Sequence, residues 1–318
     1  MLVSMKEMLA DAVKGGYAVG GFNCASLESA VAAVRASEEL DMPFILQHAT
    51  VHEPFLPLSV AGPIMLQLAR AAKTPVAVHL DHGASVAHCL RALAMGFTSV
   101  MFDGSALPFE DNAAATAQIA ETAHALGATV EAELGAMPCN FDGKLGDYAP
   151  EDFYTRPDEA RAFAERTGID ALAISFGTVH GLYKTTPKLS FDVISRVREA
   201  TGGLPLVMHG GSGLSDADYR EAAARGICKV NYYTYGALAG GRAVCELVRR
   251  KPDGLQFHDV AVAATDAIAD DIRRVMKVLA GTYSMSPGEL EAEDVGVIVP
   301  AKEDMPRKLT LIEGIRGK

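Results

Sequence analysis

The sequence contains few cysteines, and no two of them stand at the spacing of a metal or redox motif. Five cysteines are scattered over 318 residues without a C-x-x-C pair. This pattern indicates a reducing compartment rather than a disulfide framework. The first residues also lack the long apolar region and cleavage motif of a secretory signal. We therefore expect a cytoplasmic protein.

Long hydrophobic runs and positive charge are also scarce. No apolar run approaches the roughly 20 residues that a membrane-spanning helix needs, so no membrane association is expected. Lysine and arginine number 29 against 40 acidic residues, which gives a net charge of -11. Such a balance argues against nucleic acid or anionic lipid as the main partner. A small anionic substrate stays possible, because a site needs only a local positive field.

Hydrophobic residues, in contrast, make up 49% of the chain. They form short runs that alternate with stretches of helical periodicity. The runs are apolar on both faces, which is typical of buried parallel strands. Eight strands are predicted, at residues 18–23, 43–50, 75–81, 99–104, 129–135, 171–177, 205–210 and 227–233. Ser26, Asp111 and Ser215 are predicted to open three of the helices between them.

Eight strand-then-helix units predict an α/β fold, a closed (β/α)8 TIM barrel over residues 1–281. A doubly wound open sheet is the alternative. The barrel is favoured because polar and glycine-rich residues follow nearly every strand, whereas an open sheet gathers them at one switch point. Residues 136–160 are predicted to form a long active-site loop after the fifth strand. Residues 282–318 are expected to be a C-terminal extension that packs on the barrel or on a neighbouring subunit.

Function in such a barrel lies at the carboxyl ends of the strands, and three different strands end near a histidine. These are His82, His180 and His209. Three imidazoles with one open position form a catalytic zinc arrangement, in which the metal polarises a substrate oxygen. Asp103 and Glu133 also stand at strand ends. Each is a candidate for a further metal ligand, for a partner of a ligand, or for a salt bridge at the barrel mouth.

The segment VHLDHG, residues 78–83, holds two histidines that compete for the metal. Side chains alternate faces along a strand, so His79 and Asp81 share one face. His82 joins Asp81 at the mouth only if the chain bends there, and Gly83 begins the turn. We therefore expect His82 at the metal and His79 buried one layer below.

Two segments near the end of the barrel predict a phosphate site. The turn HGGSG, residues 209–213, precedes a predicted helix, and consecutive backbone N–H groups there can hold an anion. The next strand ends in NYYT, residues 231–234, and the loops after strands seven and eight are the usual phosphate site of a barrel. Lys184 could add a positive charge or be an ordinary surface lysine.

Residues 1–281 resemble the class II, zinc-dependent fructose-bisphosphate aldolases, including their tagatose-bisphosphate branch. The motifs occur in family order: GGFN, HLDHG, SVMFDGSALPFEDN, VEAELG, YTRP, DALAISFGTVHGLYK, LVMHGGSGLSD and KVNYYT. The resemblance implies that His82, His180 and His209 bind Zn2+ and that Asp81 transfers the proton of the aldehyde oxygen. It implies that Asp103 and Glu133 match positions that hold a second or displaced metal.

The resemblance further implies that the substrate is a sugar phosphate, that a monovalent cation (Na+ or K+) lies near its phosphate, and that the protein is a homodimer or homotetramer. Cleavage of a β-hydroxy ketone phosphate to dihydroxyacetone phosphate and an aldehyde leaves an enediolate, which Zn2+ stabilises. A Schiff-base mechanism would need a buried lysine at a strand end, and no lysine stands at a predicted strand end. The predicted substrate-binding residues are Asn23, Gly181, Lys184, Gly210, Gly211, Ser212, Asn231, Tyr232, Tyr233 and Thr234.

Three positions depart from the family pattern. Tyr235 stands at an acidic position, Ala237 at a position that is often basic, and Phe141 in place of a loop glutamate. Asp142, next to Phe141, is a candidate replacement acid/base. These changes favour a smaller or less anionic aldehyde half. A ketose 1-phosphate with an unphosphorylated distal end therefore stands beside fructose or tagatose 1,6-bisphosphate as the expected substrate.

Two other functional classes stay open. In a zinc-dependent barrel hydrolase the metal would activate water, although the first strand lacks the H-x-H pair that such sites commonly use. A non-catalytic or chaperone-like subunit of a two-component aldolase would explain Phe141. The intact set of Asp81 and the three histidines argues against that second class.

Overall fold

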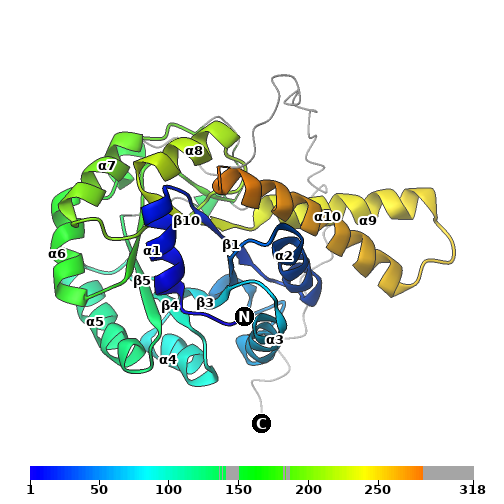
Figure 1. The fold of residues 1–318 in the computed structure, drawn as a ribbon, viewed down its shortest axis with the longest axis horizontal. Helices are drawn as coiled ribbons and strands as arrows, with labels where there is room; N and C mark the ends of the chain where they lie inside the picture. Colours follow the sequence, from blue (N-terminus) through cyan, green and yellow to red (C-terminus); the bar gives the residue numbers. More distant parts are fainter. Residues whose placement is uncertain (136, 138, 141–149, 182, 184–186, 282–318) are drawn as a thin grey trace, which may run out of the picture. The chain divides into compact units, whose positions relative to one another are not determined.

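The computed structural model describes residues 1–281 except 136, 138, 141–149, 182 and 184–186. Eight parallel strands close into a barrel in the order β1-β10-β9-β7-β5-β4-β3-β2, inside a ring of helices (Figure 1). The predicted TIM barrel is therefore confirmed. The barrel strands are β1 Val19–Asn23, β2 Phe44–Ala49, β3 Val76–Gly83, β4 Ser99–Phe102, β5 Thr129–Leu134, β7 Ala171–Ile174, β9 Leu206–Met208 and β10 Ile227–Tyr232.

Every strand prediction overlaps an observed strand, and most observed strands end earlier than predicted. β7 ends at Ile174, for example, although the apolar run continues to residue 177. Some residues beyond such ends, Asp103, Gly210 and Tyr233 among them, leave the sheet and line the mouth of the barrel. β3 is the exception, because it runs past the predicted end to Gly83. A pair of two-residue strands, β6 Cys139–Asn140 and β8 His180–Gly181, lies outside the barrel sheet.

The helices begin where their capping residues allow. Ser26 and Ser215 each make a capping box at the start of a helix, as predicted. The prediction for Asp111 was wrong: α5 begins at Phe109 after Pro108, and Asp111 lies in its first turn. An acidic side chain there still stabilises the helix through the macrodipole. The helices are α1 Met5–Gly15, α2 Leu27–Leu40, α3 Leu58–Ala71, α4 Val86–Met95, α5 Phe109–Ala125, α6 Pro157–Thr167, α7 Phe191–Ala200, α8 Asp216–Arg225, α9 Thr234–Arg250 and α10 Phe257–Leu279, with short 3-10 turns at η1 Thr50–His52 and η2 Pro150–Phe153.

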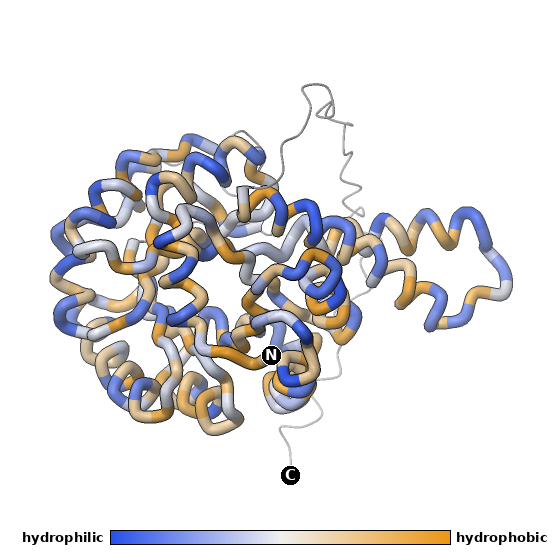
Figure 2. The backbone as a smooth tube through the Cα atoms, in the orientation of Figure 1, coloured by the Kyte–Doolittle hydropathy of each residue, from blue (hydrophilic) through white to orange (hydrophobic). Residues whose placement is uncertain are grey.

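Two hydrophobic layers hold the barrel together. The larger one lies between the strands and the outer helices, whose hydrophilic residues recur along their outer turns (Figure 2). The smaller one fills the barrel interior, where Met5 and Leu9 of α1 pack with Ile45, Ala77 and Val207. Because α1 packs on these residues at the amino-terminal end of the strands, a substrate can enter only at the other end.

Inward-facing side chains become polar toward the carboxyl ends of the strands. On β3 the inward positions read Ala77, His79 and Asp81 from bottom to top, while Val78 and Leu80 face the helices. The same alternation puts Glu131 and Glu133 of β5 into the barrel, because Val130, Ala132 and Leu134 face outward. The apolar floor therefore supports a polar layer, and that layer supports the mouth.

The predicted loop over residues 136–160 lies partly outside the described residues, at 136, 138 and 141–149, and its last four residues belong to α6. The expected extension over residues 282–318 also lies outside them. Two long helices follow β10: α9 runs away from the barrel, and α10 packs on α9 and returns to the barrel, where it contacts α2 (Figure 1). None of the described helices is long and apolar enough to cross a membrane.

Candidate active site

The carboxyl ends of the strands enclose a cavity of ≈ 340 Å³. It collects most of the predicted site residues from seven strands and the turns that follow them, and His209 lies fully buried beside it. Lys184 and Asp142 lie outside the described residues. The cavity is lined by Asn23, Ala49, Val51, His52, Asp81, His82, Asp103, Ser105, Glu133, Met137, His180, Gly181, Gly210, Gly211, Ser212, Asn231, Tyr232, Tyr233 and Thr234.

β3 bends at His82, as the expected placement of His82 beside Asp81 requires. His82 has a φ of 48°, a left-handed conformation that side chains other than glycine adopt rarely. The pairing of β3 with β4 shifts between Leu80 and Gly83 at the same point. A Cβ on Gly83 would lie 2.5 Å from the carbonyl oxygen of Met101, so the turn needs glycine. The bend brings Asp81 and His82 into one cavity, with 4.0 Å between Oδ1 and Nε2.

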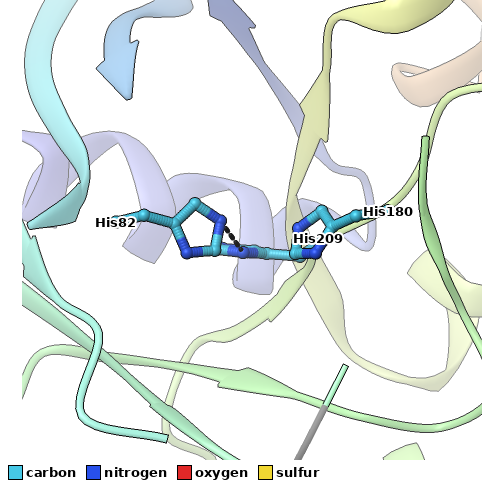
Figure 3. A group of neighbouring side chains, drawn as sticks. All are labelled: His82, His180 and His209. Carbon is cyan, nitrogen blue, oxygen red and sulfur yellow. Dashed lines mark hydrogen bonds between the residues drawn. The ribbon is translucent and has the colours of Figure 1, made fainter. Parts of the chain in front are cut away.

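Three imidazoles from three strand ends face one another (Figure 3). The Nδ1 of His209 lies 3.0 Å from the Nε2 of His82, and the His180 ring centroid is 5.0 Å from that of His82. One nitrogen from each ring lies within 4.8 Å of the others. Three imidazole nitrogens at this separation suit zinc, which takes three protein ligands in catalytic sites and leaves a fourth position for a ligand.

Asp103 and Glu133 border the same group. Asp103 Oδ2 lies 2.8 Å from the Nδ1 of His82, so it holds the ring with Nε2 toward His209. Glu133 Oε2 is buried without a hydrogen-bond partner among the described residues, 3.6 Å from the Nδ1 of His209. Burial and the charge of Asp103 raise the pKa of Glu133 to about 8. A cation beside this carboxylate would satisfy the orphaned oxygen, so the residues present fit a metal.

A buried ion pair supports His209 from below. Glu131 places Oε1 2.9 Å from the Nε2 of His209, and the Nζ of Lys229 donates to its Oε2 at 2.8 Å. All three side chains are fully buried. Burial, which would raise the pKa of Glu131, is outweighed by Lys229 and His209, and the pKa falls to about 2. The ionised carboxylate fixes the ring so that Nδ1 faces the other histidines.

Sequence reasoning missed Lys229, which lies inside the apolar run of β10 two residues before Asn231. A lone lysine within a buried strand was the available signal. It lies in the middle of the strand, outside the cavity lining, and its ammonium is paired with Glu131. His79, expected one layer below the metal, is fully buried and its Nδ1 lies 2.7 Å from the Oγ of Ser99.

Amide groups hold both carboxylate oxygens of Asp81. Asn23 Nδ2 donates to Oδ2 at 2.7 Å, and Asn231 Nδ2 donates to Oδ1 at 2.9 Å. Gln47, which sequence reasoning also missed, donates to the Oδ1 of Asn23 at 2.9 Å and orients that amide. Burial would raise the pKa of Asp81, but the charges of His82 and His209 outweigh it and hold the pKa well below its usual range. Asp81 is therefore a fixed carboxylate beside the histidines.

The predicted phosphate end gathers backbone groups. Gly210 has a φ of 64°, and a Cβ there would lie 2.5 Å from the carbonyl oxygen of Val179. Ser212 Oγ accepts from the backbone N–H of Tyr233 at 3.0 Å, and Thr234 begins α9. The free N–H groups and positive dipole of that helix end favour an anion. Glycines at the turn let backbone N–H groups approach it closely.

The two tyrosines of NYYT point in different directions. Tyr232 is 2% exposed, and its hydroxyl donates to Asp271 of α10 at 2.7 Å. The phenol of Tyr232 therefore lies in the layer between strands and helices, and only part of the residue borders the cavity. Tyr233 instead packs against His52, with ring centroids 4.6 Å apart and ring planes tilted by 52°. Tyr235, at the position that is acidic in the family, packs on Gly213 rather than lining the cavity.

Comparison with known proteins agrees with this geometry. A family profile described as "Fructose-bisphosphate aldolase class-II" matches residues 3–282. A "Probable fructose-bisphosphate aldolase" of Bacillus subtilis is 40% identical over 274 residues, which is 85% of this chain and 95% of that protein. A "Fructose-bisphosphate aldolase" of Geobacillus stearothermophilus is 41% identical over 272 residues, 84% and 93% of the two chains. The crystal structure of the YdjI aldolase from Escherichia coli K12 superposes with a TM-score of 0.77 at 34% identity, covering 88% of this chain and 97% of that one.

Proposed function

The chain belongs to the class II fructose-bisphosphate aldolase family and is an aldolase, and we propose that it depends on Zn2+ and cleaves a ketose phosphate reversibly into dihydroxyacetone phosphate and an aldehyde. The observation that carries this proposal is the meeting of three histidines with one fixed carboxylate. Asp81 and the group of His82, His180 and His209 come from three segments of the chain and line or border one cavity.

His82, His180 and His209 would hold the zinc ion, which supplies Lewis-acid charge that stabilises the negative charge developing on the substrate oxygens. Asp81 accepts the proton of the substrate hydroxyl as the carbon–carbon bond breaks, and returns it in the direction of synthesis. Its two amide donors keep the carboxylate ionised and aimed at the hydroxyl before each turnover. The buried Glu131–Lys229 pair keeps His209 in its ligating orientation.

The phosphate of the dihydroxyacetone half binds at Gly210, Gly211 and Ser212 and at the start of α9. Backbone N–H groups there favour the anion. Four expectations stay predictions: the contribution of Lys184, the presence of a monovalent cation, the oligomeric state and the cytoplasmic location. The substrate is a 1,6-bisphosphate or a ketose 1-phosphate with an unphosphorylated distal end.

Neither alternative class gains support from the site. The first strand ends at Asn23, which hydrogen-bonds Asp81 and offers no histidine pair for a hydrolytic metal. A non-catalytic subunit would have no need of a carboxylate held on both oxygens beside the metal group. The family and the geometry therefore favour carbon–carbon bond chemistry.

The test is turnover with and without metal. Purified protein loaded with Zn2+ should release dihydroxyacetone phosphate from ketose phosphates, and an excess of chelator should abolish the release. Turnover that persists after complete removal of metal would contradict the proposal. A protein that binds one zinc ion per chain but releases dihydroxyacetone phosphate from no ketose phosphate would favour the non-catalytic alternative.

A further inference from the structure

The side of the cavity beyond Asp81 differs from the phosphate end in the residues that line it. In the closed order of strands, β9 and its glycine-rich turn stand across the barrel from β3, which carries Asp81. The dihydroxyacetone half of the substrate lies toward that turn. The aldehyde carbon is the one whose oxygen exchanges a proton with Asp81, so the rest of the aldehyde must continue past Asp81, away from β9.

The residues found in that direction come from β2 and η1. Ala49 pairs with Asp81 in the sheet, and Val51 and His52 follow it and line the cavity. Tyr233 follows the end of β10, two strands from β2, and packs against His52. These three side chains, Val51, His52 and Tyr233, form the aldehyde half of the cavity. Nothing in the predicted site included Val51 or His52.

The aldehyde half is neutral. His52 is 3% exposed, and its Nδ1 is buried without a hydrogen-bond partner in the described part of the chain. Burial, with a smaller effect of His48, lowers the pKa of His52 to about 4, so the ring carries no charge near pH 7. Burial also raises the pKa of Tyr233. Of the described residues that line the cavity, none is a lysine or an arginine.

A phosphate at this end would meet no lysine or arginine among the described residues that line the cavity. Burying an unpaired anion beside Val51, His52 and Tyr233 is strongly unfavourable. A chain of hydroxyl groups faces no such cost. It can hydrogen-bond to neutral imidazole and phenol groups, and its C–H faces can pack on the two rings.

We propose that Val51, His52 and Tyr233 form the subsite for the aldehyde portion of the substrate, and that this subsite selects an uncharged, hydroxyl-bearing chain over a phosphorylated one. The inference rests on the proposed aldolase function and names the class of substrate within it: ketose 1-phosphates whose distal carbons carry hydroxyl groups.

The first experiment measures the synthesis direction with the zinc-loaded protein and dihydroxyacetone phosphate. The acceptors are acetaldehyde, glyceraldehyde and glyceraldehyde 3-phosphate. The wild type should use glyceraldehyde better than its 3-phosphate. In His52→Ala, the ratio of kcat/KM for glyceraldehyde to that for acetaldehyde should fall by about tenfold, the value of one neutral hydrogen bond. A merely structural role would lower both values and leave the ratio unchanged.

A matched control and a converse variant complete the test. His258 is exposed at the start of α10, so His258→Ala should keep the wild-type ratio. Val51 is 57% exposed, so Val51→Arg should fold and place a cation in the aldehyde half. That variant should raise the preference for glyceraldehyde 3-phosphate over glyceraldehyde by about tenfold or more, as expected for a hydrogen bond to a charged group.

The outcomes separate the two proposals. If the zinc-loaded protein adds dihydroxyacetone phosphate to no aldehyde, the proposed function and this inference are both wrong. If it is active but the wild type prefers glyceraldehyde 3-phosphate, or His52→Ala leaves the ratio unchanged, the aldolase function stands and the subsite is wrong.

Discussion

The two ends of the active-site cavity differ in how their polar groups are held. At the metal half, defined by His82, His180, His209, Asp103 and Glu133, a carboxylate fixes two of the three rings: Asp103 holds His82 and Glu131 holds His209. At the aldehyde half, His52 keeps a buried nitrogen without a partner among the described residues and is held by packing on Tyr233.

This difference separates reaction type from substrate choice. Fixed dipoles and charges cost no reorganisation when charge develops in the transition state, so the metal half suits chemistry that is the same for every substrate. The aldehyde half is neutral, and the described residues leave a nitrogen of His52 without a hydrogen-bond partner. It can therefore accept different hydroxylated chains. The metal half therefore accounts for membership of the aldolase family, and the aldehyde half for the choice of substrate.

Removing the metal should have the largest effect. Treatment with a chelator, followed by gel filtration, should lower kcat by at least about 10³-fold, because Lewis-acid stabilisation contributes several kcal/mol. Adding back Zn2+ should restore activity, and Mg2+ should not, since nitrogen ligands suit zinc. Full activity in metal-free protein would show that the metal half does not carry the chemistry.

Asp81→Asn should follow, with kcat lowered by about 10²–10⁴-fold, the usual contribution of a positioned acid/base. The amide keeps the shape of the side chain but cannot accept the hydroxyl proton. Zinc content, measured by atomic absorption, should stay at the wild-type level, which separates proton transfer from metal binding. A variant that retains wild-type kcat would show that another group moves the proton.

Lys229→Met tests the support beneath the metal half. Without its cation, Glu131 no longer has one partner for each oxygen, and the orientation of His209 loosens. Zinc affinity in a competition assay with a chromogenic chelator should fall about 10–100-fold. Lys6→Met removes an exposed lysine that pairs with Asp170 and should leave the affinity unchanged. Equal affinity in the two variants would mean that the buried pair only fills space.

The smallest effect should appear in the pH dependence of stability at the aldehyde half. His52 has a native pKa of about 4, below its usual value of 6.5. Between pH 4 and 6.5 the unfolded chain therefore binds a proton that the native state does not bind. Stability is therefore lost as pH falls through this window, by at most about 1.4 kcal/mol per pH unit for one proton. His52→Phe should lose less stability than the wild type between pH 6.5 and 4.5 in urea unfolding. Parallel curves would show that His52 is not held neutral.

The sequence predicted the barrel because each strand is apolar on both faces and each is followed by a helix signal. It also predicted which segments reach the cavity, since strand alternation and the turn at Gly83 separate His79 from His82. It could not predict Glu131 with Lys229 or Gln47 with Asn23. These pairs depend on register across a closed barrel, and Lys229 and Glu131 are 98 residues apart in the chain.

Two features of the cavity were not visible in the sequence pattern. Alternation from Asn231 puts Tyr232 on the outer face, where Asp271 receives its hydroxyl, yet the run NYYT was interpreted as one substrate-binding segment. His52 lies on a short 3-10 turn without glycine or strand periodicity, so no pattern in the sequence marked it. A turn that follows a strand can place residues in the cavity, just as the end of the strand can.

The most direct measurement compares two substrates on one zinc-loaded preparation. It is the ratio of kcat/KM for cleavage of fructose 1-phosphate to that for fructose 1,6-bisphosphate, with tagatose 1-phosphate and tagatose 1,6-bisphosphate as the second pair. Our account predicts that the monophosphate is the better substrate in at least one pair. A bisphosphate cleaved more than about tenfold faster in both pairs would contradict the neutral aldehyde half.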